Sequence, residues 1–121
     1  PYILYTIVRI KSILNRCTQD GGSLEEGQIK EAVSESEKAL MLELTRFNSV
    51  VENAFEEKAP HKICGYIYDL ANDFNHFYHE TKILSEEKKE QKASWIHLLL
   101  LTRDVLETSI DLLGFSAPER M

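Results

Sequence analysis

The side chains with the clearest chemical potential in this sequence are tyrosines that stand close to an arginine. Tyr2, Tyr5 and Arg9 are three and four residues apart, so a helix would place them on one face. A second group of rings follows later in the chain: His76, Phe77, Tyr78 and His79. Such rings and guanidinium planes stack on the splayed bases of RNA loops, but tyrosines at helical spacing also occur at core edges. The residue types alone therefore leave a nucleic-acid contact and a structural role both open.

No catalytic or metal-binding motif accompanies these residues. His76 and His79 lie three residues apart, but a zinc site needs further convergent ligands, and no HExxH pattern is present. The adjacent Gly21 and Gly22 do not belong to a phosphate-binding loop, and no serine or cysteine has the surroundings of a nucleophile elbow. We therefore expect no catalytic residue, no metal ion and no cofactor in these 121 residues.

The charge balance limits how the chain could hold a nucleic acid. Its formal net charge is −6, whereas attraction to phosphates requires clustered Lys and Arg. Any RNA contact must therefore be local and geometric, or assisted by another domain, and we expect no DNA binding. Cys17 and Cys64 do not have the spacing of a disulfide framework or a metal site, and no apolar run is long enough for a bilayer. These features predict buried or half-buried thiols, a cytoplasmic protein and no membrane contact.

Helical patterns run through the whole sequence. Residues 1–17 carry an apolar stripe at helical spacing. Ser23-x-x-Glu26 and Ser34-x-x-Glu37 have the form of capping boxes, the first opening a short weak helix to residue 33. The second box opens a helix that we expect to end at a turn near Asn48, where another helix begins.

The second half of the chain has the strongest periodicity. A helix is predicted after Pro60 from five apolar positions, namely Ile63, Ile67, Leu70, Phe74 and Phe77. Gly65 lies within this helix and suggests a close contact with a neighbour. The last helix is expected from about residue 87 to 113, with Gly114 as its stop. Residues 1–121 are thus predicted to form one all-α domain, a bundle of about five helices.

Three motifs resemble one protein family. Residues 1–14 read PYxxYxxxRIxSIL, residues 66–78 read YxYDLAxxFNxFY and residues 111–121 read DLLGFxAPERM. In this order they are similar to the C-terminal anticodon-binding domain, of DALR type, of class I arginyl-tRNA synthetases. The middle helices match only in character. In the first motif, Leu4 and Ile7 stand where that family commonly has a polar residue and a histidine or aromatic residue.

The resemblance implies an all-helical module that binds the anticodon stem-loop of tRNA(Arg). The parent enzyme would use ATP with Mg²⁺ to ligate arginine to this tRNA in the cytoplasm, through a catalytic domain upstream of Pro1. The family's anticodon site corresponds here to five residues: Tyr2, Tyr5, Arg9, Tyr78 and Met121. On the same basis we expect Met121 to be the natural C-terminus, whose carboxylate could accept a hydrogen bond from the amino group of a cytosine.

A helical protein-interaction module without RNA binding is the alternative. The acidic surface and the long amphipathic last helix are compatible with it. Such a module would need a sizeable apolar groove for a partner helix. A fold that brings the tyrosines, Arg9 and the C-terminus to one rim would favour RNA instead.

Overall fold

The regular structure of this chain is helical throughout the part that can be described. The computed structural model describes residues 2–19 and 28–116. Five helices follow one another in these ranges: α1 (Tyr2–Gln19), α2 (Glu35–Thr45), α3 (Phe47–Glu56), α4 (His61–Glu80) and α5 (Lys89–Ser116). The predicted all-α bundle of about five helices is therefore confirmed.

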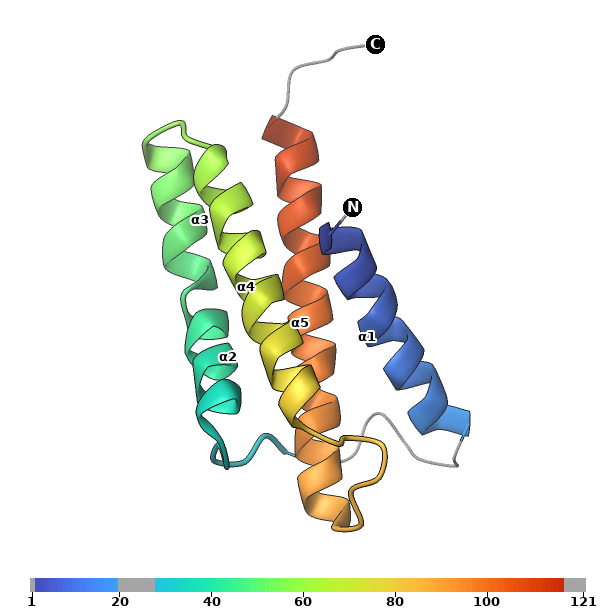
Figure 1. Cartoon of the computed structure of the whole chain (residues 1–121). Helices are drawn as coiled ribbons and strands as arrows, with labels where there is room; N and C mark the ends of the chain where they lie inside the picture. Colours follow the sequence, from blue (N-terminus) through green and yellow to red (C-terminus); the bar gives the residue numbers. More distant parts are fainter. Residues whose placement is uncertain (1, 20–27, 117–121) are drawn as a thin grey trace.

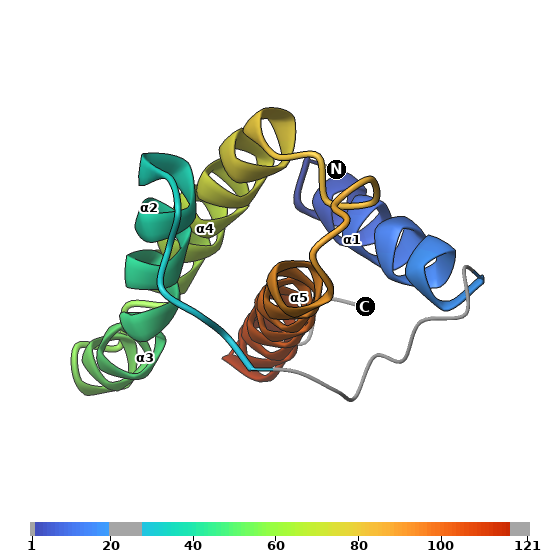
Figure 2. The same ribbon diagram turned by 90° about the horizontal axis from the view of Figure 1, so that it is seen from below.

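Helix α4 is the central element of the bundle. α2 and α3 run nearly in line along one side of α4, and α1 lies on the other side of the bundle (Figure 1). Seen from below, α4 and α5 form the middle of the structure, between α2–α3 and α1 (Figure 2). α1 packs on both α4 and α5. Side chains on one face of α1 therefore meet elements from the second half of the chain.

The core forms because α4 and α5 carry apolar side chains at helical spacing. All five predicted core positions of α4, from Ile63 to Phe77, are buried. From α5 they meet Leu98, Leu99 and Leu106, which are also buried. Burying one such side chain stabilises the fold by about 1.5–3 kcal/mol. The predicted α4 stripe is thus the main packing surface of the domain.

Helix α4 has two further sides with different chemistry. At 3.6 residues per turn, Tyr68, Asn72, Asn75 and Tyr78 lie on one side of the core stripe. The opposite side carries acidic residues and one histidine, namely Asp69, Asp73, His76 and Glu80. The first side faces α1, so the periodicity that buries Phe74 also directs the two asparagines towards α1.

The start of α2 confirms one predicted capping box. The backbone N–H of Glu37 donates to Oγ of Ser34 (3.2 Å), and Oε1 of Glu37 accepts from the backbone N–H of Val33 (3.0 Å). Two free donors at the helix start are thereby satisfied. One carboxylate oxygen of the fully buried Glu37 side chain thereby has a hydrogen-bond partner.

Other predicted boundaries were wrong. Residues 28–33 are not helical, and the Ser23–Glu26 box lies outside the described residues. In place of a helix, the backbone N–H of Lys30 donates to Oγ of Ser94 (2.8 Å), which ties this segment to α5. The break between α2 and α3 exists as predicted but falls at Arg46, two residues before Asn48.

The two glycines in α4 and α5 also differ from their predicted roles. α5 continues through Gly114 to Ser116, so Gly114 does not stop the helix. A Cβ atom at Gly65 would meet no other atom within 4 Å, so this glycine marks no close helix contact. Of the thiols, Cys17 is buried as predicted, whereas Cys64 is exposed.

Candidate nucleic-acid interface

A network of side-chain hydrogen bonds joins α1 to α4. We call it the α1–α4 polar network, and it consists of Tyr2, Thr6, Arg9, Asn72 and Asn75. The three α1 residues are four and three apart, and the two asparagines are three apart, so each set lies on one helix face. The matching spacings let two polar faces meet along the contact.

Asn75 is the centre of this network. Its Oδ1 accepts from Nη1 of Arg9 (2.6 Å), and its Nδ2 donates to the hydroxyl oxygens of Tyr2 (2.9 Å) and Thr6 (3.0 Å). The Tyr2 hydroxyl in turn donates to Oδ1 of Asn72 (2.7 Å). One amide therefore fixes three side chains of α1, although it is 66 or more residues away from them in sequence.

Arg9 is held against an aromatic face. Its guanidinium carbon lies 4.7 Å from the centroid of the Tyr78 ring, a distance typical of a cation–π contact. Tyr78 is backed on another side by Phe74, with nearly parallel rings 6.2 Å apart. Because Asn75 occupies one nitrogen of Arg9, the remaining guanidinium donors can serve a ligand. Arg9 and Tyr78 thus offer a donor group and a ring at one place.

Tyr2 and Tyr5 were both predicted as RNA-binding residues, but they have different surroundings in the structure. The Tyr2 hydroxyl both donates and accepts within the α1–α4 polar network, and its ring contacts Tyr68 (5.6 Å between centroids). Tyr5 is 74% exposed. It lies one turn from Arg9 on α1, so its ring is the more available surface for stacking.

The structure thus brings together three of the five predicted site residues, Tyr2, Arg9 and Tyr78, and places Tyr5 beside them. Met121 lies outside the described residues. Sequence reasoning missed Thr6, Asn72 and Asn75 as site residues. The signal that could have found Asn75 was its place three residues before Tyr78, inside a motif already noted.

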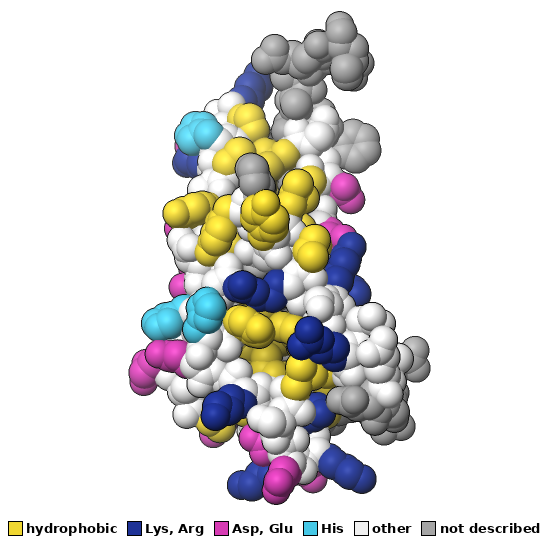
Figure 3. Space-filling model, turned by 45° about the vertical axis from the view of Figure 1, so that its right-hand side comes forward, with side chains coloured by type: hydrophobic (Ala, Val, Ile, Leu, Met, Phe, Trp, Pro, Cys, Tyr) yellow, Lys and Arg dark blue, Asp and Glu magenta, His cyan; other side chains and the backbone are white. Residues whose placement is uncertain are grey.

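The surface of this side of the molecule has a distinct charge pattern. Figure 3 brings the α1 side forward and shows hydrophobic side chains gathered in its upper half. Lys and Arg side chains lie mainly from the middle downward, and acidic side chains lie towards the edges. The exposed apolar residues of α1 are Tyr2, Leu4, Tyr5 and Val8. An acidic protein therefore presents a locally apolar and basic face here.

An acidic cluster lies on the opposite side of α4. Burial, together with the carboxylates of Asp73 and Asp69, raises the pKa of Glu43 above its ordinary value, although Arg46 opposes this change. Burial and Asp69 likewise raise the pKa of Asp73, while His76 opposes the rise. Burial also raises the pKa of the Tyr66 phenol, whose hydroxyl donates to the Glu43 carbonyl oxygen (2.7 Å). These groups form a second electrostatic feature, separate from the α1–α4 polar network.

This cluster predicts how stability depends on pH. Carboxyls whose pKa is raised by folding bind protons more tightly in the folded state, so their contribution to stability grows as pH falls. The gain begins as pH falls through the raised pKa and is complete below the ordinary values of 4.5 for Glu43 and 3.8 for Asp73. When the pH is lowered from 7 to 4.5, the melting temperature of Asp73→Asn should therefore rise less, relative to pH 7, than that of the parent. Thermal melts at each pH measure this difference. Asp111→Asn, on the exposed surface of α5, is the control and should behave as the parent; equal slopes for all three chains would contradict the assignment.

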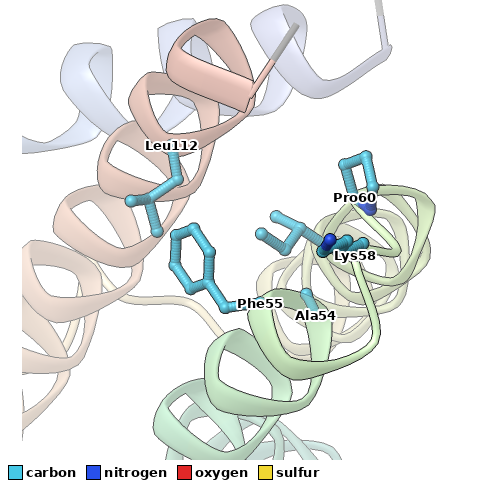
Figure 4. A pocket seen from close by; sticks show the side chains of 6 residues that line it. Ala54, Phe55, Lys58, Pro60 and Leu112 are labelled. Carbon is cyan, nitrogen blue, oxygen red and sulfur yellow. The ribbon is translucent and has the colours of Figure 1, made fainter.

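A small apolar cleft lies away from this interface, between α3, α4 and α5. It has a volume of about 270 Å³ and is lined by Ala54, Phe55, Lys58, Pro60, Ile63 and Leu112. In Figure 4, Phe55 of α3 and Leu112 of α5 point towards each other across it. The cleft is smaller than the roughly 300–1,000 Å³ of typical ligand pockets. It does not provide the long groove that a partner helix would need.

Comparison with known proteins identifies the family. Residues 3–121 match the DALR anticodon binding domain family. The chain belongs to this family. Among its relatives are proteins named arginine–tRNA ligase from Agathobacter rectalis (60% identical) and Alkaliphilus oremlandii (55%), each matching all of this chain. The DALR domain spans about a fifth of the length of these relatives, 21% and 20% respectively.

A solved structure supports the fold of the DALR domain. A chain from Campylobacter jejuni, named as an arginyl-tRNA synthetase, superimposes with a TM-score of 0.78. The match covers 99% of this chain and 26% of that chain, at 24% identity. Membership of the DALR family does not favour the alternative of a protein-interaction module. Within the described residues, no helix is both long and apolar enough to cross a membrane, and no three His, Cys, Asp or Glu side chains are grouped to hold a metal ion.

Proposed function

We propose that this chain is the anticodon-binding domain of a cytoplasmic arginine–tRNA ligase, and that its partner is the anticodon stem-loop of tRNA(Arg). The proposal is supported by the high identity to arginine–tRNA ligases along the whole chain. The structural observation that carries it is the meeting of Arg9 and Tyr78 beside the exposed Tyr5. The ATP-dependent joining of arginine to tRNA, with Mg²⁺, would belong to a catalytic domain of the same protein outside this chain.

The geometry suggests how a base would be held. An unstacked base of the loop would stack on Tyr5, since sequence-specific RNA recognition uses splayed bases and aromatic rings. The free guanidinium donors of Arg9 would then meet the acceptor atoms of that base. Tyr2 would hold α1 in place through its two hydrogen bonds and not touch the RNA with its hydroxyl. Met121 is proposed as a further contact of the same RNA loop.

Tyr5→Ala tests this assignment. Loss of one base-stacking ring should weaken binding by about 1–3 kcal/mol. Because Tyr5 is 74% exposed, the melting temperature of the Tyr5→Ala variant should be nearly that of the parent. Binding is measured by NMR titration with an anticodon stem-loop that has cytosine at its centre, at low salt so that millimolar affinities are detected. The same titration with a stem-loop that has uracil at its centre measures how strongly the domain prefers cytosine.

Phe55→Ala is the matched control, because it removes an aromatic ring that is 59% exposed on α3. It should bind as the parent does. Equal binding by the parent, Tyr5→Ala and Arg9→Ala would rule out this site, and no resonance shifts with any stem-loop would rule out RNA binding by the domain.

A further inference from the structure

A second cavity lies beside Tyr78, below the proposed base site. It has a volume of about 370 Å³ and is lined by Ile13, Tyr78, His79, Thr81, Lys82, Ile83, Leu84 and Ser85. α1 supplies one wall, the end of α4 supplies another, and the α4–α5 connection closes it. The Tyr78 ring is common to both places, since it contacts Arg9 and also lines this cavity. A chain of nucleotides that reaches Arg9 would therefore pass close to this opening.

The charge of the cavity is unusual for so acidic a protein. Its lining contains Lys82 and His79 and no carboxylate. Lys82 is exposed and forms no ion pair with any residue in the described ranges. A further cation lies near, because Nζ of Lys92 donates to the carbonyl oxygen of Leu84 (3.1 Å). Arg9, on the neighbouring ring face, is bonded to a neutral amide and not to a carboxylate.

The adjacent cavity provides a contrast. It has a volume of about 520 Å³ and shares Thr81, Lys82 and Ser85 with the first. Its lining also contains Lys88 and three carboxylates, those of Glu80, Glu86 and Glu87, so carboxylates outnumber lysines there. An anion would be repelled there and attracted to the carboxylate-free side. The α4–α5 connection therefore separates a cation-lined cavity from an acidic one.

We propose that the cavity beside Tyr78 binds a backbone phosphate of the anticodon loop, with Lys82 as its cation. Apolar Ile13, Ile83 and Leu84 would receive the sugar of the same nucleotide. The inference rests on the proposed function, because it assumes that the base of an adjacent nucleotide contacts Tyr5, Arg9 and Tyr78. Lys82 would add affinity without selecting the sequence, since phosphate contacts position a nucleic acid and base contacts specify it.

The test is the salt dependence of stem-loop binding. Removing one phosphate contact reduces the slope of log K against log salt by about 0.7 for single-stranded RNA. Lys82→Gln should show this reduction, with equal weakening for stem-loops that have cytosine or uracil at the centre. Lys88→Gln removes the same charge from the same connection, but the Lys88 side chain lines the acidic cavity and not the cavity beside Tyr78. It should keep the parent slope.

A chemical variation of the RNA identifies the phosphate. We would prepare a series of stem-loops, each with a neutral methylphosphonate at a different loop position. The affinity of each is measured for the parent and for Lys82→Gln. At one position, the neutral linkage should weaken binding to the parent and have no further effect on Lys82→Gln. Such non-additivity indicates a direct contact.

The results separate this inference from the proposed function. If the parent binds and Tyr5→Ala weakens binding, but Lys82→Gln keeps the parent slope or no linkage is coupled to it, the phosphate site is wrong and the base site stands. If the parent binds no stem-loop, both are wrong. A reduced slope for Lys82→Gln together with one coupled linkage supports the phosphate site.

Discussion

Phe77→Ala should lower the free energy of unfolding by about 3–5 kcal/mol, the largest effect expected of any substitution considered for this domain. Phe77 is fully buried and packs between Phe74 (6.5 Å between ring centroids) and Trp95 (6.3 Å). Alanine would leave a cavity between α4 and α5, the two helices at the middle of the bundle. Because marginal domains have only 5–15 kcal/mol of stability, this variant should be close to unfolding at 37 °C.

Urea unfolding followed by tryptophan fluorescence measures this loss. Trp95 is the only tryptophan of the chain and touches Phe77, so its emission reports on the affected part of the core. Phe55→Ala, which removes the same atoms from an exposed position, should change the unfolding free energy by no more than about 0.5 kcal/mol. Similar midpoints for Phe77→Ala and Phe55→Ala would show that the packing between α4 and α5 has been misassigned.

Asn75→Ala should affect both stability and RNA binding. It removes one exposed bond to Tyr2 and two partly buried bonds, to Thr6 and Arg9, at a cost of about 1–3 kcal/mol in unfolding free energy. Arg9 also loses the bond that fixes it over Tyr78. We expect stem-loop affinity to fall about tenfold, which corresponds to 1.4 kcal/mol.

Asn72→Ala is the control for this substitution. Asn72 has the same side chain on the same helix, and its side-chain bond within the described residues is to Tyr2 and not to Arg9. Its affinity for the stem-loop should match the parent. In an Arg9→Ala background, Asn75→Ala should have little further effect on affinity, because Arg9 is the group that Asn75 positions. Full additivity of the two substitutions would contradict that role.

The sequence predicted the core of this domain well for a simple reason. The α4 stripe consists of large apolar side chains at strict helical spacing, and all of them are buried. Periodicity reports burial directly, and no distant partner has to be known. The capping box at Ser34 was predictable on the same ground, since its partner Glu37 is three residues away.

The sequence could not predict features that depend on distant partners. Asn75 resembles any polar residue on a half-exposed helix face, and its bonds reach residues 66 to 73 positions earlier. The segment of residues 28–33 carries helix-compatible residues, but the bond from Lys30 to Ser94 spans 64 positions. Nothing in the sequence distinguished Tyr2 from Tyr5. They differ because the Tyr2 hydroxyl bonds to two asparagines of α4.

The candidate site was therefore predictable in part. Tyr5, Arg9 and Tyr78 followed from residue type, spacing and resemblance, and the structure brings Arg9 and Tyr78 together. The cation-lined cavity was not visible in the sequence. Its lining comes from α1, α4 and the connection after α4, and its charge depends on which side of that connection the carboxylates occupy.

The three-sided character of α4 restricts how the length of this helix can vary. Inserting one residue in a helix rotates everything beyond it by about 100°. An insertion before Asn72 would turn the polar side of α4 away from α1 and move the Phe74 and Phe77 rings out of the core. Length variation among homologues should therefore collect in the connections on either side of α4, where a change in residue number leaves its three sides in register.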